Sequence, residues 1–167
     1  GMVSPGEALL RSTARAKDLV VVSGTPGLAA LALHCLQHKL PVDDAAWRAF
    51  ARPEPRLQLG QALRGRASAC IDISDGLAAD LGHIAAASNL GAEVFLDRLP
   101  RAPAMRKLGP EQLWELQLGG GDDYELCFTA PPSRAEDIEE ALEASGTLVR
   151  RIGQLVQLRR FAQGADQ

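Results

Sequence analysis

The chain has 167 residues, of which 46% are hydrophobic but only 4% aromatic, and its formal net charge is −3. This length and composition predict about one domain with an aliphatic core. The acidic balance argues against nucleic-acid binding, and apolar runs such as LAALAL at 28–33 are too short to cross a bilayer. Three widely spaced cysteines without a CxxC pair indicate free thiols in a cytoplasmic protein.

The first part of the chain alternates strand-like and helix-like segments. The apolar, β-branched run DLVVVSG predicts a buried strand over 18–24. The proline-rich segment RPEPR, residues 52–56, is expected to be a stiff linker. Around it, helices are expected over 28–39, 44–51 and 57–65. A second strand is expected over 69–73.

The second part continues this alternation. The helix after Asp75 carries Leu77, Leu81 and Ile84 on one side and should stop near Asn89. Helices are also expected near 111–116 and, from its capping box, over 133–146. Strands are expected over 92–97, 122–129, 147–153 and 154–160. The predicted fold class is therefore α/β (α+β), a mixed β-sheet flanked by helices, with one domain over 1–160 and a loose tail over 161–167.

The segment IDISDGL, residues 71–77, combines a strand end, a helix start and several polar side chains. Ser74 or Asp75 could cap the helix by accepting hydrogen bonds from its first N–H groups. Capping does not explain Asp72, because an unpaired carboxylate in a buried strand needs a cationic partner or a metal ion. Two carboxylates around a hydroxyl also suit Mg²⁺ and phosphate. The local pattern leaves both interpretations open.

A second acidic joint is GGGDDYELCF, residues 119–128. Three glycines permit close backbone approach, and Asp122 and Asp123 follow them before a predicted strand. The simplest interpretation is a turn with two solvated carboxylates. Its similarity to the first joint weakens that interpretation, because loops at strand ends commonly carry ligand sites.

Other candidate sites have weaker support. The turn at 24–27 lacks the Lys-Ser/Thr of a phosphate-binding loop. His34 and His38 lie one helical turn apart, but no third metal ligand is evident nearby, and His83 is expected to flank the buried stripe of its helix. No histidine accompanies Cys70 or Cys127, which argues against a cysteine nucleophile.

Four segments in order resemble the thiamine-monophosphate kinase family. They are GMVSPGEALLRSTARAKDLVVVSGTPG, RPEPR, IDISDGLAADLGHIA, and GGGDDYELCFT with the closing RIGQL. Together they resemble the C-terminal half of these kinases, a domain type shared with aminoimidazole ribonucleotide synthetase. The resemblance implies ATP- and Mg²⁺-dependent phosphorylation of thiamine monophosphate to thiamine diphosphate, without a covalent nucleophile.

The resemblance also implies roles for individual residues. Asp72 and Asp75 correspond to magnesium ligands, and Ser74 to a contact with ATP. Asp122 falls where the family contacts the thiamine phosphate substrate, although the family usually has Glu there. The family's closing aromatic segment is not visible in LRRFAQGADQ, residues 158–167.

The family's N-terminal half, with most of its magnesium ligands, much of its ATP site and its dimer interface, has no counterpart in this sequence. We therefore expect an expressed fragment or a truncated gene product that is inactive alone, as a monomer or a non-native oligomer. The alternative is a non-catalytic binding or assembly module that keeps the fold. A sister synthetase is disfavoured by the DISDGL and GGGDDYEL loops.

Overall fold

The computed structural model describes residues 3–158, apart from the side chains at 141, 142 and 144. The five strands are β1 (Leu19–Ser23), β2 (Ala69–Asp72), β3 (Leu90–Val94), β4 (Leu126–Ala130) and β5 (Val149–Gln157). The six α-helices are α1 (Leu28–Gln37), α2 (Asp44–Ala51), α3 (Leu57–Ala62), α4 (Leu77–Ala87), α5 (Pro110–Gly119) and α6 (Ala135–Ser145). Three short 3₁₀ helices are η1 (Leu96–Arg98), η2 (Pro103–Met105) and η3 (Pro132–Arg134).

The strands form one sheet in the order β2-β4-β1-β5-β3. All four neighbouring pairs are antiparallel, so the α/β class with a helix-flanked sheet is confirmed but the expected mixed pairing is wrong. The helix-linked strands β1, β2 and β3 do run in one direction, as their alternation with helices suggests. The later strands β4 and β5 insert between them in the opposite direction, which makes every neighbouring pair antiparallel.

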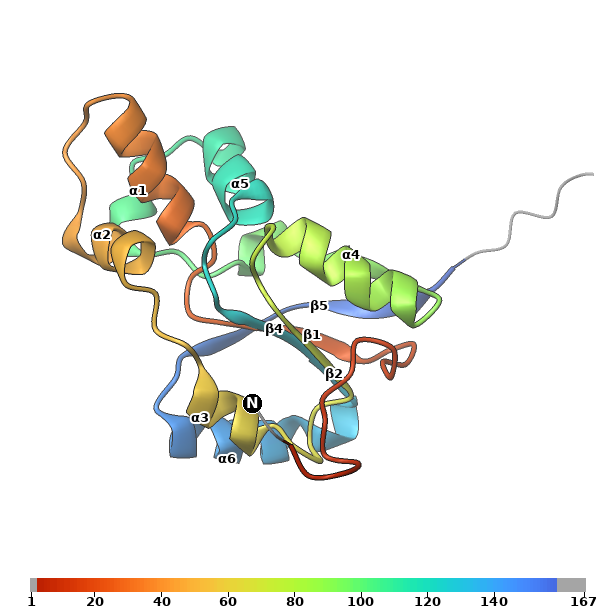
Figure 1. Ribbon diagram of the computed structural model, residues 1–167. Coiled ribbons are helices and arrows are strands. Elements are labelled where there is room, and N and C mark those ends of the chain that lie inside the picture. The colour runs from red at the N-terminus through yellow and green to blue at the C-terminus, as the bar shows by residue number, and fades with distance from the viewer. Residues whose placement is uncertain (1–2, 159–167) are drawn as a thin grey trace, which may run out of the picture.

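Helices lie on both faces of the sheet (Figure 1), and each face has its own hydrophobic cluster. On one face, Leu77, Leu81 and Ile84 of α4 are buried against strand residues such as Val20 and Val22, as the apolar stripe of that helix predicts. On the other face, α3 and α6 cover residues that include Val21 and Phe128. The alternation of Val20, Val21 and Val22 between the two clusters follows from the two-residue period of a strand.

Helices α1, α2 and α5 gather beside the sheet around a third cluster (Figure 1). Leu31, Ala46 and Leu113 contribute one buried side chain from each helix. This unit is joined to the sheet where β1 ends and where α5 leads toward β4. It therefore lies next to the end of the sheet at which the acidic joints meet.

Three strand predictions differ from the structure. The strand expected over 122–129 is β4, Leu126–Ala130, because residues 122–125 belong to the preceding loop. The strands expected over 147–153 and 154–160 are one strand, β5, because Gly153 continues the ladder instead of turning it. A Cβ at Gly153 would lie 2.0 Å from the Glu93 carbonyl oxygen, so glycine permits close packing of β5 on β3. The strand expected over 92–97 lies at Leu90–Val94, and η1 ends it. The tail predicted over 161–167 lies outside the described residues.

Candidate functional site

The two acidic joints lie side by side and are hydrogen-bonded to one another. We call residues 73–76 the Ser74 loop and residues 119–125 the glycine loop. The Asp122 and Tyr124 amides donate to the Ser74 and Ile73 carbonyls, each at 2.9 Å. The Ile73 amide donates to the Glu125 carbonyl at 2.8 Å. These bonds extend the β2–β4 ladder beyond both strands and hold the loops together.

Glycine is required where the loops approach most closely. A Cβ at Gly121 would lie 2.4 Å from the Ser74 carbonyl oxygen, far inside van der Waals contact. Gly76 has a φ of 111°, a conformation that L side chains rarely adopt. Asp122 and Tyr124 also have positive φ values, 62° and 52°, although neither is glycine. Such backbone strain is typical of ligand-binding loops.

The three polar residues predicted from the first joint line one pocket of about 410 Å³. Asp72, Ser74 and Asp75 share this lining with Asp80, His83 and Arg11, so we call it the acidic pocket. Among residues 3–158, no ion pair involves any of its three carboxylates. The sequence analysis expected Asp72 to be a carboxylate within a buried strand. This expectation is wrong, because β2 is an edge strand and the Asp72 side chain is exposed.

Asp80, which the sequence analysis did not single out, shapes the Ser74 loop. Its carboxylate oxygen Oδ2 accepts the backbone N–H groups of Ser74 at 2.9 Å and Asp75 at 3.0 Å. The N-cap of α4 is Gly76, without a side-chain hydrogen bond, so the predicted capping by Ser74 or Asp75 is wrong. A carboxylate from the first turn of the helix reaches back to the loop instead.

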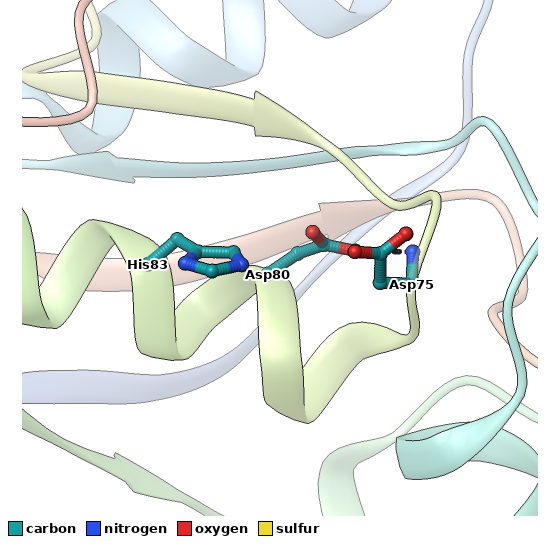
Figure 2. A group of neighbouring side chains, drawn as sticks. All are labelled: Asp75, Asp80 and His83. Atoms are coloured by element: carbon teal, nitrogen blue, oxygen red, sulfur yellow. Dashed lines mark hydrogen bonds between the residues drawn. The ribbon is translucent and has the colours of Figure 1, made fainter.

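Asp75, Asp80 and His83 place one potential metal-ligand atom each within 4.8 Å of one another (Figure 2). Asp80 and His83 are three residues apart on α4 and therefore lie on one helix face. Asp75 reaches them from the loop (Figure 2). Asp72 lines the same pocket but is not part of this group. The carboxylates have the ligand chemistry that Mg²⁺ prefers.

Asp122 faces a neighbouring pocket of about 590 Å³ between the glycine loop, α1 and α5. This pocket is also lined by His34, Phe50, Gln112 and Glu115. The exposed Asp122 side chain accepts a hydrogen bond of 3.2 Å from the Tyr124 hydroxyl, and this bond raises the pKa of Tyr124. The structure thus brings Asp72, Ser74 and Asp75 into one pocket and Asp122 into the next.

The second acid of the glycine loop, Asp123, has a structural role. Its buried carboxylate accepts the N–H groups of Gly27 at 2.6 Å and Ala29 at 3.3 Å, and so caps α1 from a distant segment. Burial raises the pKa of Asp123 to about 7, against the effect of these two donors. The interpretation of 119–128 as a turn with two solvated carboxylates is therefore wrong for Asp123.

Glu125 and Arg56 join two motifs that are far apart in the sequence. Arg56 donates from Nε at 2.8 Å and from Nη2 at 2.6 Å to the two oxygens of Glu125, and Ser23 also donates to that carboxylate. The hydrogen bond with Glu125 raises the pKa of Arg56. The charged residues of RPEPR indicate that this segment could form an ion pair, but the sequence does not show that the partner of Arg56 is Glu125.

The structure gives no further support to the turn at 24–27, the histidine pair or the cysteines as functional sites. At the turn over 24–27, the Gly27 amide is occupied by Asp123. His34 interacts with Gln112 and stacks on His38 with ring centroids 4.2 Å apart. Burial raises the pKa of Cys70 to about 12, which keeps it as an unreactive thiol.

A family model for the C-terminal domain of AIR synthase related protein matches residues 15–163. The chain is 45% identical over 161 residues to thiamine-monophosphate kinase of Escherichia coli strain K12, covering 93% of this chain and 50% of that protein. It is 37% identical over 163 residues to thiamine-monophosphate kinase of Caulobacter vibrioides, covering 94% and 46%. The chain therefore spans about half the length of these relatives.

Two solved structures agree with these sequence matches. Thiamine-monophosphate kinase from Stenotrophomonas maltophilia K279a superimposes with a TM-score of 0.89 at 40% identity, over 94% of this chain and 53% of that one. AaThiL complexed with AMPPCP and TMP superimposes with a TM-score of 0.75 at 28% identity, over 90% and 48%. Within residues 3–158, every helix is too short or too polar to cross a membrane.

Proposed function

Because this chain belongs to the AIR synthase related family as its C-terminal domain, we propose that it is one half of a thiamine-monophosphate kinase. The resemblance expected from the sequence is confirmed by the relatives it matches. The proposed reaction is ATP- and Mg²⁺-dependent transfer of a phosphoryl group to thiamine monophosphate. A cytoplasmic enzyme fits its three free cysteines.

The observation that carries this proposal is the acidic pocket. Asp72, Ser74 and Asp75, the three residues with roles implied by the DISDGL resemblance, line it together. Asp72 and Asp75 are exposed, and no ion pair reaches them within residues 3–158, so both carboxylates are available to a cation. We infer that these two hold Mg²⁺, which binds proteins through a few carboxylates while keeping several waters.

Other groups beside the acidic pocket would bind the nucleotide and the substrate. The α4 N-terminus has no side-chain cap, which leaves backbone N–H groups beside Ser74 for phosphate oxygens. Asp122, on the adjoining loop, would orient thiamine monophosphate at the neighbouring pocket. Bound Mg²⁺ would neutralise phosphate charge and align the reacting oxygens. The hydrogen bonds between the two loops would fix the distance between the nucleotide and the substrate.

We expect this chain alone to lack kinase activity, because one acidic pocket supplies few ligands for a triphosphate. The first test is a turnover assay with ATP, Mg²⁺ and thiamine monophosphate, in which activity of the chain alone would contradict the expected inactivity. The second is a fusion of the N-terminal half of the E. coli relative to this chain. We expect the fusion to be active as a dimer formed through the added half.

In that fusion, Asp72→Asn and Asp75→Asn should each lower kcat/KM by about 100-fold or more, because each removes a proposed cation ligand. Asp97→Asn is the matched control, since Asp97 is an exposed acid on η1 outside the acidic pocket. Full activity of a folded Asp72→Asn fusion would refute the assigned role.

The alternative is a non-catalytic module in which the acids are merely solvated. Calorimetry with Mg²⁺ and ATP on the chain and on Asp72→Ala separates the two. Metal-linked nucleotide binding that is lost in Asp72→Ala supports a residual half of an active site. Absence of binding by either protein favours the module.

A further inference from the structure

A groove of about 800 Å³ lies between the first described residues of the chain, the 52–56 linker with α3, and the ends of β2 and β4. We propose that this groove, which we call the α3 groove, is the surface on which the N-terminal half of a thiamine-monophosphate kinase docks. The inference rests on the proposed function and goes beyond it, because it gives that half a place on this chain.

The α3 groove is lined by apolar side chains that remain exposed to water. Leu57 is 71% exposed and Val3 is 52% exposed, although both are aliphatic. Leu9 and Leu126 add partly buried side chains to the same lining. Exposed apolar side chains that gather at one place are typical of a surface that another protein segment covers.

Charged side chains complete the lining of the α3 groove. Arg64 pairs with Glu7 at 2.9 Å, and these side chains are 37% and 49% exposed, so both reach solvent. Arg56 lines the groove from the linker, where Glu125 holds it. An apolar centre surrounded by polar and charged groups is the usual anatomy of a protein–protein interface.

The position of the chain start favours the preceding half of the kinase as the occupant. Val3 and Glu7 form one wall of the groove, so a polypeptide joined ahead of the described residues would enter beside it. The matching family model is a C-terminal domain, and about half of the E. coli relative lies outside the match. A half joined at this place reaches the groove without crossing the rest of the molecule.

The α3 groove also adjoins the acidic pocket. Leu9, Cys70 and Asp72 line both of them. A half docked in the groove would therefore lie against the carboxylates proposed to hold Mg²⁺. Ligand sites occur preferentially at the interface between domains. Docking here would let the second half complete the cation site while the two acidic joints keep their positions.

The experiment compares Leu57→Cys in the 167-residue chain and in the fusion with the E. coli half. Both proteins are treated with N-ethylmaleimide, and labelling at position 57 is followed by peptide mass spectrometry, so the three native cysteines do not interfere. We expect position 57 to react at least about tenfold more slowly in the fusion, because the docked half excludes the reagent. Gln61→Cys, at a second exposed position of the lining, should be protected as well.

Leu158→Cys is the matched control. Leu158 is 61% exposed and lies close to Gly91 of β3, at the opposite edge of the sheet from β2. Its labelling rate should agree within about twofold between the chain and the fusion. Circular dichroism checks folding, and a fusion with the Caulobacter vibrioides half is used if the first fusion does not fold.

Docking and catalysis give separate results. Protection of position 57 in a folded fusion without kinase activity would support docking and contradict only the proposed reaction. Equal labelling of position 57 in the chain and in an active fusion would overturn the docking, because the added half would then lie elsewhere. Protection that appears in the chain alone and grows with its concentration would also overturn it, since a second copy would then occupy the groove.

Discussion

Buried carboxylates stabilise both the Ser74 loop and the glycine loop, but their hydrogen-bond partners lie at different separations along the sequence. At the Ser74 loop, Asp80 of α4 accepts hydrogen bonds from two loop amides five and six residues away. In the glycine loop, Asp123 and Glu125 bind groups 69 to 102 residues away. The first arrangement shapes one loop, whereas the second ties β1, α1 and the 52–56 linker to β4. We therefore expect damage to the glycine loop to unfold the protein and damage to the Ser74 loop to change ligand binding.

Buried and exposed acids of the two loops differ in role: the buried acids hold the structure together, and the exposed acids can contact ligands. Asp80, Asp123 and Glu125 are buried and hydrogen-bonded, whereas Asp72, Asp75 and Asp122 are exposed. Burial of a carboxylate is tolerated when N–H or O–H groups stabilise it. The exposed acids make no comparable contribution to packing, which leaves them available to a cation or a substrate.

Removal of Glu125 should have the largest effect, if the glycine loop holds distant segments together. Glu125→Ala leaves Arg56 without its bidentate partner, and we expect the free energy of unfolding to fall by about 4 kcal/mol. Urea denaturation monitored by circular dichroism measures this change.

Glu54→Ala is the control for Glu125, because Glu54 also pairs with Arg56, at 3.3 Å, but is 82% exposed at its side chain. We expect a loss of less than about 0.5 kcal/mol for this exposed pair. Equal effects of the two substitutions would show that the contact with Glu125 does not anchor the linker.

Separating the two loops should have the next largest effect. In Gly121→Ala the new methyl group would lie 2.4 Å from the Ser74 carbonyl oxygen, so the loops must move apart at a cost of about 3 kcal/mol. The Asp122 amide bond to Ser74 should also be lost, which amide hydrogen exchange would detect as faster exchange at Asp122.

Gly119→Ala is the matched control for this substitution. A Cβ at Gly119 meets no atom within 4 Å, and this residue ends α5 with no positive φ. Its effect on the free energy of unfolding should stay within about 0.5 kcal/mol. A similar loss in both variants would contradict the requirement for close contact at Gly121.

The smallest of these effects concerns pH. Burial raises the pKa of Asp123 from 3.8 to about 7, so the folded protein binds this proton more tightly than the unfolded chain. The stabilisation is therefore full below pH 3.8 and is lost as the pH rises toward 7. Between pH 5 and pH 8 this group should lower the free energy of unfolding by about 2 kcal/mol.

Asp123→Asn removes this titration, so its unfolding free energy should change less between pH 5 and pH 8 than that of the original chain. Other titrating groups contribute to both proteins, and the difference isolates Asp123. Parallel pH dependences in urea denaturation would show that Asp123 is charged in the folded protein throughout this range.

Much of the secondary structure followed from local sequence. The β-branched run at β1, the apolar stripe of α4 and the helix at Asp44–Ala51 were all predicted from local residue preferences, which depend on near neighbours. Gly153 misled the prediction, because a glycine that ends a strand and one that permits close strand packing look alike in sequence. The direction of β4 and β5 was also missed, since pairing of strands depends on distant segments.

For the candidate site, too, some features could be predicted from the sequence and others could not. The sequence by itself proposed Asp72, Ser74, Asp75 and Asp122 as site residues, because two acidic, glycine-containing joints are unusual at strand ends, and their roles stay predictions. Only the tertiary structure showed that the joints pair with each other, that Asp80 and His83 enter the acidic pocket, and that Asp123 is buried as a cap. The physical reason is that residue type limits what a side chain can bind, whereas burial and contacts between distant segments decide what it does bind.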